Sequence, residues 1–268
     1  MERLSQNNQG ELSHISQGGL WNLTQIKRIC LGCADEFTAL NLGLATRTHC
    51  SKCNEQKMIA QAENQRQAEA DAEASRYRGL IKTAAIPPKW RATTFENSDP
   101  RLNKGGFRVA KRYAETFSLQ SDSLIFYSPG NGTGKTHLGA CIANYILHEK
   151  KTSVLFKKSR DLMLDIRHTF SDREESEAGV LNEVLSVPLL ILDDVGVDQP
   201  SDWLKATYWT VFDRRVESQL PMVITTNRPL EAPVGQMALE DRIGLGAVSR
   251  LIHLCRGNVI DMTGPDLR

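Results

Sequence analysis

The sequence lacks any long hydrophobic run, and neither sign of charge prevails in it. No uninterrupted apolar stretch reaches the ~18 residues that would span a bilayer, so we expect no membrane helix and no membrane partner. Residues 1–20 are rich in Gln, Ser, Asn and Gly without an apolar stretch, which excludes a secretory signal and predicts a disordered N-terminus in a cytoplasmic protein. The 33 basic and 32 acidic side chains leave a net charge of +1, so only a local basic patch could bind nucleic acid.

Cysteines are few, but four of the six are grouped. They follow the spacing C-x2-C-x16-C-x2-C and are Cys30, Cys33, Cys50 and Cys53. Disulfides are rare in a reducing cytosol, and this spacing is typical of a tetrahedral structural zinc site. His49 could substitute as a ligand, but the four cysteines already fill the site. A pair of redox motifs is the alternative, but no thioredoxin-like pattern surrounds them. We expect Cys141 and Cys255, which lie in apolar stretches, to be inert core residues.

The composition predicts one large domain with an appendage. Hydrophobic residues make up 40% of the 268, which argues against a fully disordered chain. From Glu55 to Arg78 no Gly or Pro occurs, which predicts a helix ended by Gly79. The helix is polar nearly all round, so it is either a solvated spacer or a helix that binds a partner or its own copy. The predicted parts are a disordered segment (1–20), a zinc module (21–54), a helical linker (55–85) and a large domain (86–268).

Short apolar runs alternate with helical patterns in the large domain. The runs lie at 123–127, 153–156, 189–192, 222–225 and 259–262, and the helical patterns at 104–118, 136–149, 159–169, 181–185 and 202–216. Buried runs of this length separated by helices indicate parallel strands covered on both faces. The fold class is therefore α/β, with a five-stranded parallel sheet.

A glycine-rich loop follows the first run and opens a helix. It reads Ser128-Pro129-Gly130-Asn131-Gly132-Thr133-Gly134-Lys135-Thr136 and continues into His137. Strand, glycine-rich loop and helix are the context of a phosphate loop, in which backbone N–H groups cradle the phosphates. Lys135 is then expected to reach the β- and γ-phosphates of ATP, and the Thr136 hydroxyl to bind Mg²⁺. Pro129 departs from the usual pattern, which has glycine six residues before the lysine. The candidate nucleotide ligands are Gly130, Asn131, Gly132, Thr133, Gly134, Lys135, Thr136 and His137.

Two further strands end in polar residues. The run 189–192 leads into Asp193 and Asp194, which predicts a metal-side acid at 193 and an acid that orients or deprotonates water at 194. The alternative is that the two acids only cap the strand. The run 222–225 leads to Asn227, which could hold the attacking water or sense the γ-phosphate, although Asn also favours turns.

Arg250 lies in a helical segment after the last of these motifs. Its distance from the phosphate loop predicts that it reaches the nucleotide of a neighbouring subunit rather than its own. A solvated helix residue is the alternative, and Arg242 is a weaker candidate for the same role.

Taken together, these motifs resemble AAA+ ATPases, and the residues around them resemble the bacterial replicative-helicase loaders of the DnaC/DnaI type. The matching segments are Ile86-Pro87-Pro88-Lys89-Trp90, Thr94-Phe95, Thr136-His137-Leu138, Asp193-Asp194-Val195-Gly196, Ser249-Arg250-Leu251 and Gly264-Pro265-Asp266-Leu267-Arg268. The sequence departs from that family at Gly246, where a second arginine is frequent. As expected for loaders, it has no C-terminal helical lid, and only Arg256 and Arg268 remain as candidates for a second sensor arginine.

The resemblance implies a weak, Mg²⁺-dependent ATPase that assembles on ATP or DNA and loads the replicative helicase onto single-stranded DNA. The N-terminal cysteine module would dock on the helicase, as the DnaI branch implies. Local basic clusters fit single-stranded DNA, or else are solvated faces; they are Arg101, Lys104, Arg108, Lys111 and Arg112, and Lys157, Lys158 and Arg160. Alternatives are an IstB-like ATPase assisting transposition, a zinc-dependent DNA-binding regulator and, least fitting, a small-molecule kinase.

Overall fold

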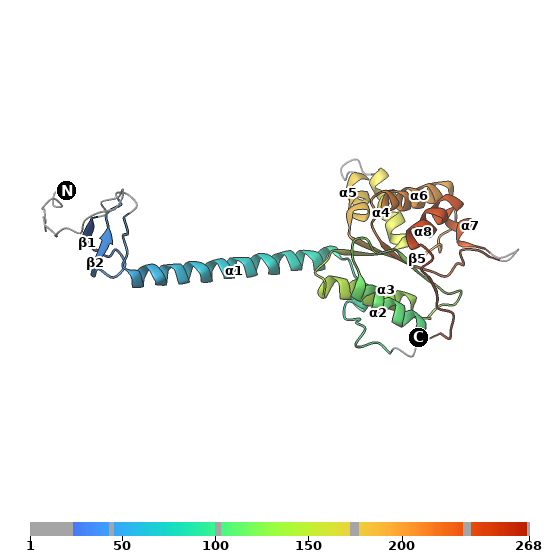
Figure 1. The fold of residues 1–268 in the computed structure, drawn as a ribbon. Helices are drawn as coiled ribbons and strands as arrows, with labels where there is room; N and C mark the ends of the chain where they lie inside the picture. Colours follow the sequence, from blue (N-terminus) through green and yellow to red (C-terminus); the bar gives the residue numbers. More distant parts are fainter. Residues whose placement is uncertain (1–23, 43–45, 100–102, 172–176, 233–236, 267–268) are drawn as a thin grey trace, which may run out of the picture. The chain divides into compact units, whose positions relative to one another are not determined.

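The computed structural model describes residues 24–42, 46–99, 103–171, 177–232 and 237–266 (Figure 1). The predicted disordered segment 1–20 lies outside these ranges. The chain divides into two compact units between Ala72 and Glu73. In the described ranges, no helix is both long enough and apolar enough to cross a membrane.

The N-terminal unit contains a β-hairpin that the sequence patterns did not reveal. Strands β1 (Gln25–Ile29) and β2 (Glu36–Leu40) pair antiparallel, with Ile26 opposite Ala39. Most of their side chains are exposed, so the hairpin buries little apolar surface. Such a small unit needs another source of stability, and its cysteines provide the candidate.

Helix α1 (Ser51–Thr83) is longer than predicted at both ends, and the boundary between the two units falls inside it. None of its residues is buried, in line with its polar sequence. The prediction that Gly79 ends the helix is wrong. A glycine inside a helix costs only about 1 kcal/mol, and beyond it Leu80 and Ala84 pack on the core of the C-terminal unit, which favours continuation.

The C-terminal unit confirms the predicted five-stranded parallel sheet. Its strands are β3 (Leu124–Tyr127), β4 (Val154–Lys158), β5 (Leu189–Val195), β6 (Met222–Thr226) and β7 (Val259–Asp261), in the order β4-β5-β6-β3-β7. The helical segments are η2 (Pro88–Trp90), α2 (Lys104–Thr116), α3 (Lys135–His148), α4 (Ser159–Ser171), α5 (Glu177–Ser186), α6 (Asp202–Glu217), α7 (Leu239–Ile243) and α8 (Leu245–Cys255). From β7 to residue 266 the described chain has no helix.

Helices cover both faces of this sheet (Figure 1). Helices α4 to α8 lie on one face, and α2 and α3 lie on the other. Strand β5 shows why the chain folds this way, because its side chains alternate between the two cores. Leu190 and Leu192 join the core beneath α4 to α8, while Leu189 and Ile191 join the core beneath α2 and α3.

The strand order brings three predicted site segments to one edge of the sheet. Strands β5, β6 and β3 are neighbours and run in the same direction. Their carboxyl ends therefore lie side by side, and the segments that leave them carry the glycine-rich loop, the acid pair and Asn227. In open α/β sheets, ligands bind at this edge.

Candidate nucleotide site and cysteine cluster

The glycine-rich loop between β3 and α3 has the backbone of an anion cradle. Gly132 and Gly134 adopt positive φ angles of 71° and 92°, which other residues rarely adopt. Gly134 caps α3, so the N-terminus of that helix opens into the loop. The Lys135 ammonium donates to the Gly130 carbonyl at 2.8 Å and the Ser128 carbonyl at 3.4 Å. Pro129 therefore does not prevent the loop from forming.

Asp193 is linked directly to the loop. Its carboxylate is 1% exposed and accepts hydrogen bonds from the hydroxyls of Thr136 at 2.8 Å and Thr225 at 2.7 Å. Burial, together with the neighbouring Asp194, raises the pKa of Asp193 above its ordinary value. The Thr136–Asp193 contact joins the two residues that the sequence assigns to Mg²⁺.

Asp194 differs from Asp193 in its exposure and in its hydrogen bonds. It is half-buried and lines the cleft next to the loop, and its carboxylate has no hydrogen bond within the described ranges. Its φ of 59° is uncommon for a residue with a side chain, and the β5–β6 register shifts between Leu192 and Val195. Asp194 thus lies at an irregularity of β5 and lines the cleft, and its role as an acid that acts on water stays a prediction.

Asn227 connects the tip of β6 to the glycine-rich loop. Its Nδ2 donates to the Asn131 Oδ1 at 2.8 Å. Its own Oδ1 is buried and has no partner among the described residues. Because a buried acceptor without a partner is costly, this oxygen is a candidate to receive a hydrogen bond from a ligand or from water.

The loop residues 131–136, Asp194 and Asn227 line a cleft of about 630 Å³, while Gly130 and the buried Asp193 are absent from its lining. The cleft also has an apolar half, made by Trp90, Phe107, Leu138 and Met262. Sequence reasoning assigned none of these four to the site. Trp90 lies in the segment 86–90, which was used only for the family resemblance. Met262 lies near the C-terminal end of the sequence, far from the glycine-rich loop.

His137, a predicted nucleotide ligand, contacts the segment before α2 within the described protein. Its Nε2 lies 2.6 Å from the Ser98 hydroxyl, and its ring packs edge-on against Trp90, with centroids 5.9 Å apart. Burial lowers the pKa of His137, which favours the neutral ring. The residue also lines the cleft, so it supports the cleft wall and can still face a nucleotide.

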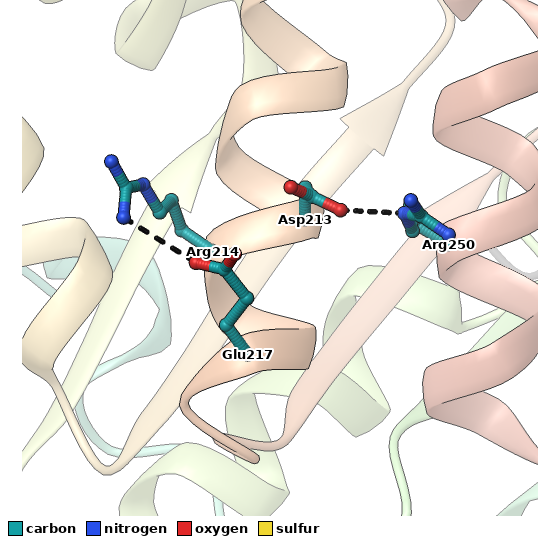
Figure 2. A network of polar contacts seen from close by, with 4 residues as sticks. All are labelled: Asp213, Arg214, Glu217 and Arg250. Atoms are coloured by element: carbon teal, nitrogen blue, oxygen red, sulfur yellow. Dashed lines mark hydrogen bonds and ion pairs between the residues drawn. The ribbon is translucent and has the colours of Figure 1, made fainter.

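Arg250 does not line the cleft of its own chain. It lies on α8, and its Nε donates to the Asp213 Oδ1 on α6 at 2.6 Å (Figure 2). Arg242, the weaker candidate, is 8% exposed and donates to the Asp198 carbonyl, so its role here is structural. Arg256 is exposed and pairs with Asp122 at 3.4 Å, and Arg268 lies outside the described ranges.

The four clustered cysteines converge in the N-terminal unit. Their sulfur atoms all lie within 4.8 Å of one another, and those of Cys33 and Cys50 are 3.6 Å apart. A tetrahedral zinc ion with Zn–S bonds of about 2.3 Å needs sulfurs about 3.8 Å apart.

A Cβ at Gly32 would stand 3.0 Å from the Cys53 sulfur, so a larger residue there would crowd the cluster. The backbone N–H of Cys50 lowers the pKa of Cys30 to about 6, which favours the thiolate at that position, whereas the pKa values of Cys33 and Cys53 are raised within the cluster. The donor set fits zinc.

Replacing Cys50 and Cys53 with serine is expected to remove a structural metal. Serine hydroxyls are poor zinc ligands, and the exposed hairpin has little else to hold it. Elemental analysis should give about one zinc per purified chain and almost none in the double variant. ATP binding should survive, because the cleft belongs to the other unit. Cys255→Ala, which lies outside the cluster, is the control and should keep its zinc. Far less than one zinc in the unchanged chain would refute the site.

The fold and cleft define a P-loop nucleotide-binding protein of the AAA+ type. The profile of a family described as IstB-like ATP binding protein matches residues 43–268, and the chain belongs to this family. The replicative helicase loader DnaC of Escherichia coli K12 is 32% identical over 185 residues, covering 66% of this chain and 74% of the loader. The Buchnera aphidicola (Schizaphis graminum) protein of the same name is 37% identical over 144 residues, covering 52% and 57%.

Solved structures support the same fold. A crystal structure of the DnaC helicase loader superposes with a TM-score of 0.57 at 22% identity, covering 67% of this chain and all of that one. A DnaI crystal structure gives a TM-score of 0.51 at 21% identity, covering 69% and 95%. AMPPCP-bound DnaA from Aquifex aeolicus gives 0.53 at 20%, covering 64% and 50%. At such identities the likeness concerns the fold.

Proposed function

We propose that this protein hydrolyses ATP to load a replicative helicase onto single-stranded DNA. The observation that carries the proposal is that the glycine-rich loop, Asp194 and Asn227 line one cleft, with Asp193 bonded to Thr136 beneath it, in a chain 32% identical to a named helicase loader. The family is ATP-binding by description. Hydrolysis, the Mg²⁺ requirement and the helicase partner are part of the proposal.

The residues of the cleft divide the work of hydrolysis. When ATP binds, the Lys135 ammonium would leave the loop carbonyls and contact the terminal phosphates. Thr136 and Asp193 would hold Mg²⁺, which would neutralise phosphate charge. Asp194 orients the attacking water and accepts its proton. The Asn227 oxygen, which has no partner among the described residues, would hold that water, or the side chain would sense the γ-phosphate. The apolar half of the cleft, with Trp90 and Phe107, suits the adenine ring.

Arg250 completes the site of a neighbouring copy. It is absent from the lining of its own cleft and is partly exposed on α8. A guanidinium supplied in trans stabilises charge on the transferred phosphoryl group, so ATP hydrolysis depends on assembly. We therefore expect a weak ATPase whose activity rises when copies gather on ATP or single-stranded DNA.

The N-terminal part serves as the docking module for the helicase. The cysteine cluster beside the hairpin and the exposed α1 support a zinc module followed by a helical linker, and we keep the bounds 21–54, 55–85 and 86–268 for zinc module, linker and ATPase domain, although α1 starts at Ser51 and the two compact units divide between Ala72 and Glu73. The four cysteines leave no open coordination position, so the zinc acts in structure rather than in ATP chemistry. The whole assembly would act in the cytoplasm.

Single-stranded DNA contacts the ATPase domain through basic side chains. The two clusters differ, because Lys157 pairs with Asp165 at 2.7 Å and Arg160 with Asp198 at 3.8 Å. On α2 the described cations have no ion pair with another described residue, and together with Phe107 and Glu115 they line a groove of about 430 Å³; they are Lys104, Arg108, Lys111 and Arg112. Arg101 lies outside the described ranges. The α2 cations, and Lys158 of the second cluster, which also has no ion pair with a described residue, are therefore the candidates to neutralise phosphates.

An IstB-like role in DNA transposition is the second candidate, favoured by the family match over residues 43–268. The two functions differ in the protein that the chain recruits. The test is affinity capture with the full-length chain in extracts of its own host, with the Cys50→Ser/Cys53→Ser variant as control. Recovery of the hexameric replicative helicase by the unchanged chain alone supports loading. Recovery of a transposase and no helicase overturns it.

A further inference from the structure

The contact between Arg250 and Asp213 uses Nε and leaves the two terminal guanidinium nitrogens without a hydrogen bond to a described residue. The Nε atom of Arg250 donates to Asp213 Oδ1 at 2.6 Å (Figure 2). An acid that blocked the guanidinium would occupy the terminal nitrogens, which form the fork that binds phosphate. Asp213 instead accepts a hydrogen bond from Nε, on the side of the guanidinium.

A second pair on the same helix shows that this contact is not an ordinary surface ion pair. Arg214 and Glu217 lie within one turn of α6, 3.4 Å apart, with side chains 63% and 59% exposed (Figure 2). Asp213 and Arg250 join two different helices, and their side chains are 20% and 43% exposed. The Asp213 carboxylate is therefore held in a recess, and the guanidinium that it grips remains at the surface.

The pair belongs to a regular seam between α6 and α8. One helical turn away on both helices, Trp209 lies against Gly246, where an added Cβ would come within 3.0 Å of the indole Cδ1. Trp209 is 44% exposed and Leu245 is 70% exposed. Two exposed apolar side chains thus lie on the same two helices as the Asp213–Arg250 pair. This combination suits a second copy of the chain that brings its phosphates to Arg250.

We propose that Asp213 is the positioning residue of the trans-acting arginine: it fixes the guanidinium of Arg250 for the ATP bound by the neighbouring copy. This inference rests on the proposed role of Arg250. A free arginine side chain would lose rotamer freedom each time a neighbour docked. With Nε already held, part of that cost is met during folding.

Alanine at position 213 tests this role. In the full-length chain assembled with ATP on oligodeoxythymidylate, we expect Asp213→Ala to lower kcat about tenfold, a fraction of the ~10³-fold that a complete arginine finger contributes elsewhere. The KM for ATP should not change, because Asp213 does not line its own cleft. Asp213→Glu should restore part of kcat. Glu217→Ala, which breaks the exposed pair on the same helix, is the matched control and should leave kcat unchanged.

Mixing variants separates positioning from folding. Lys135→Ala supplies an intact Asp213–Arg250 pair, and Asp213→Ala supplies an intact ATP site, so the mixture should exceed both parents. If the alanine variant does not fold by thermal melting, Asp213→Asn, which keeps the size of the side chain, takes its place. If Arg250→Ala is slow but Asp213→Ala keeps the kcat of the unchanged chain, the inference about Asp213 is wrong while the trans arginine stands. The same holds if Lys135→Ala restores activity when mixed with Arg250→Ala but not when mixed with Asp213→Ala. If Arg250→Ala has the same kcat as the unchanged chain, both the proposed trans arginine and the inference about Asp213 are wrong.

Discussion

Asp194→Asn is expected to bind ATP and to turn it over at least about 10²-fold more slowly than the unchanged chain. Asp194 faces the cleft, and no hydrogen bond within the described ranges occupies its carboxylate. The amide of asparagine has nearly the same shape, but it cannot accept a proton from water. The phosphate-binding loop lies on another strand connection and keeps its contacts, so nucleotide affinity should stay within a fewfold.

Two measurements on each variant give the answer, the Kd for ATP and the rate of phosphate release. Asp193→Asn is the informative comparison, because Asp193 accepts hydrogen bonds from both Thr136 and Thr225. That change should weaken Mg²⁺-dependent binding as well as turnover. If Asp194→Asn hydrolyses ATP as fast as the unchanged chain, the assignment of the water-side acid is wrong.

Lys135→Ala and Arg250→Ala are each expected to be nearly inactive, and mixing them should restore activity. Alanine at position 135 removes the main point charge for the phosphates, so ATP binding fails in that chain. Alanine at position 250 leaves ATP binding intact but removes the guanidinium offered to a neighbour. In a mixed assembly, an Arg250→Ala chain binds ATP and can receive the arginine of a Lys135→Ala chain.

The mixture also discriminates between the two possible roles of Arg250. Specific activity should pass through a maximum as the ratio of the two variants is varied, and activity of the unchanged chain should rise with its concentration. Mixing Lys135→Ala with Asp194→Asn is the control, because its only sites that bind ATP lack the water-side acid. Turnover per chain that never varies with concentration, together with no recovery at any ratio, would show that Arg250 is a surface residue without a role in hydrolysis.

Local patterns predicted most of the sheet and the polar half of the cleft. Strand β5 is an uninterrupted apolar run because both of its faces are buried, and the acids at its end mark the edge where ligands bind. The glycine-rich loop is equally local, since its positive φ angles require glycine at fixed positions. Parallel order then places the ends of β3, β5 and β6 together, so three separate motifs predict one site.

Features that depend on distant parts of the chain were not predictable in this way. Trp90 and Met262 meet in the cleft from opposite ends of the C-terminal unit, and neither stands in a motif that specifies the contact. The Asp213–Arg250 pair joins residues 37 positions apart on two helices. The hairpin of the N-terminal unit escaped notice because its strands are short and mostly exposed, so hydrophobic alternation is weak.

The most direct test of the central claim is the retention of the host's replicative helicase on closed circular single-stranded DNA. A circle offers no free end, so a ring-shaped helicase stays on it only if it is opened and closed around the strand. With the unchanged chain and ATP, helicase should remain bound through gel filtration. Lys135→Ala should leave the helicase off the circle, and Glu217→Ala should load it normally. Equal retention with the unchanged chain, with Lys135→Ala and with no added chain would contradict the proposal that this protein loads the helicase.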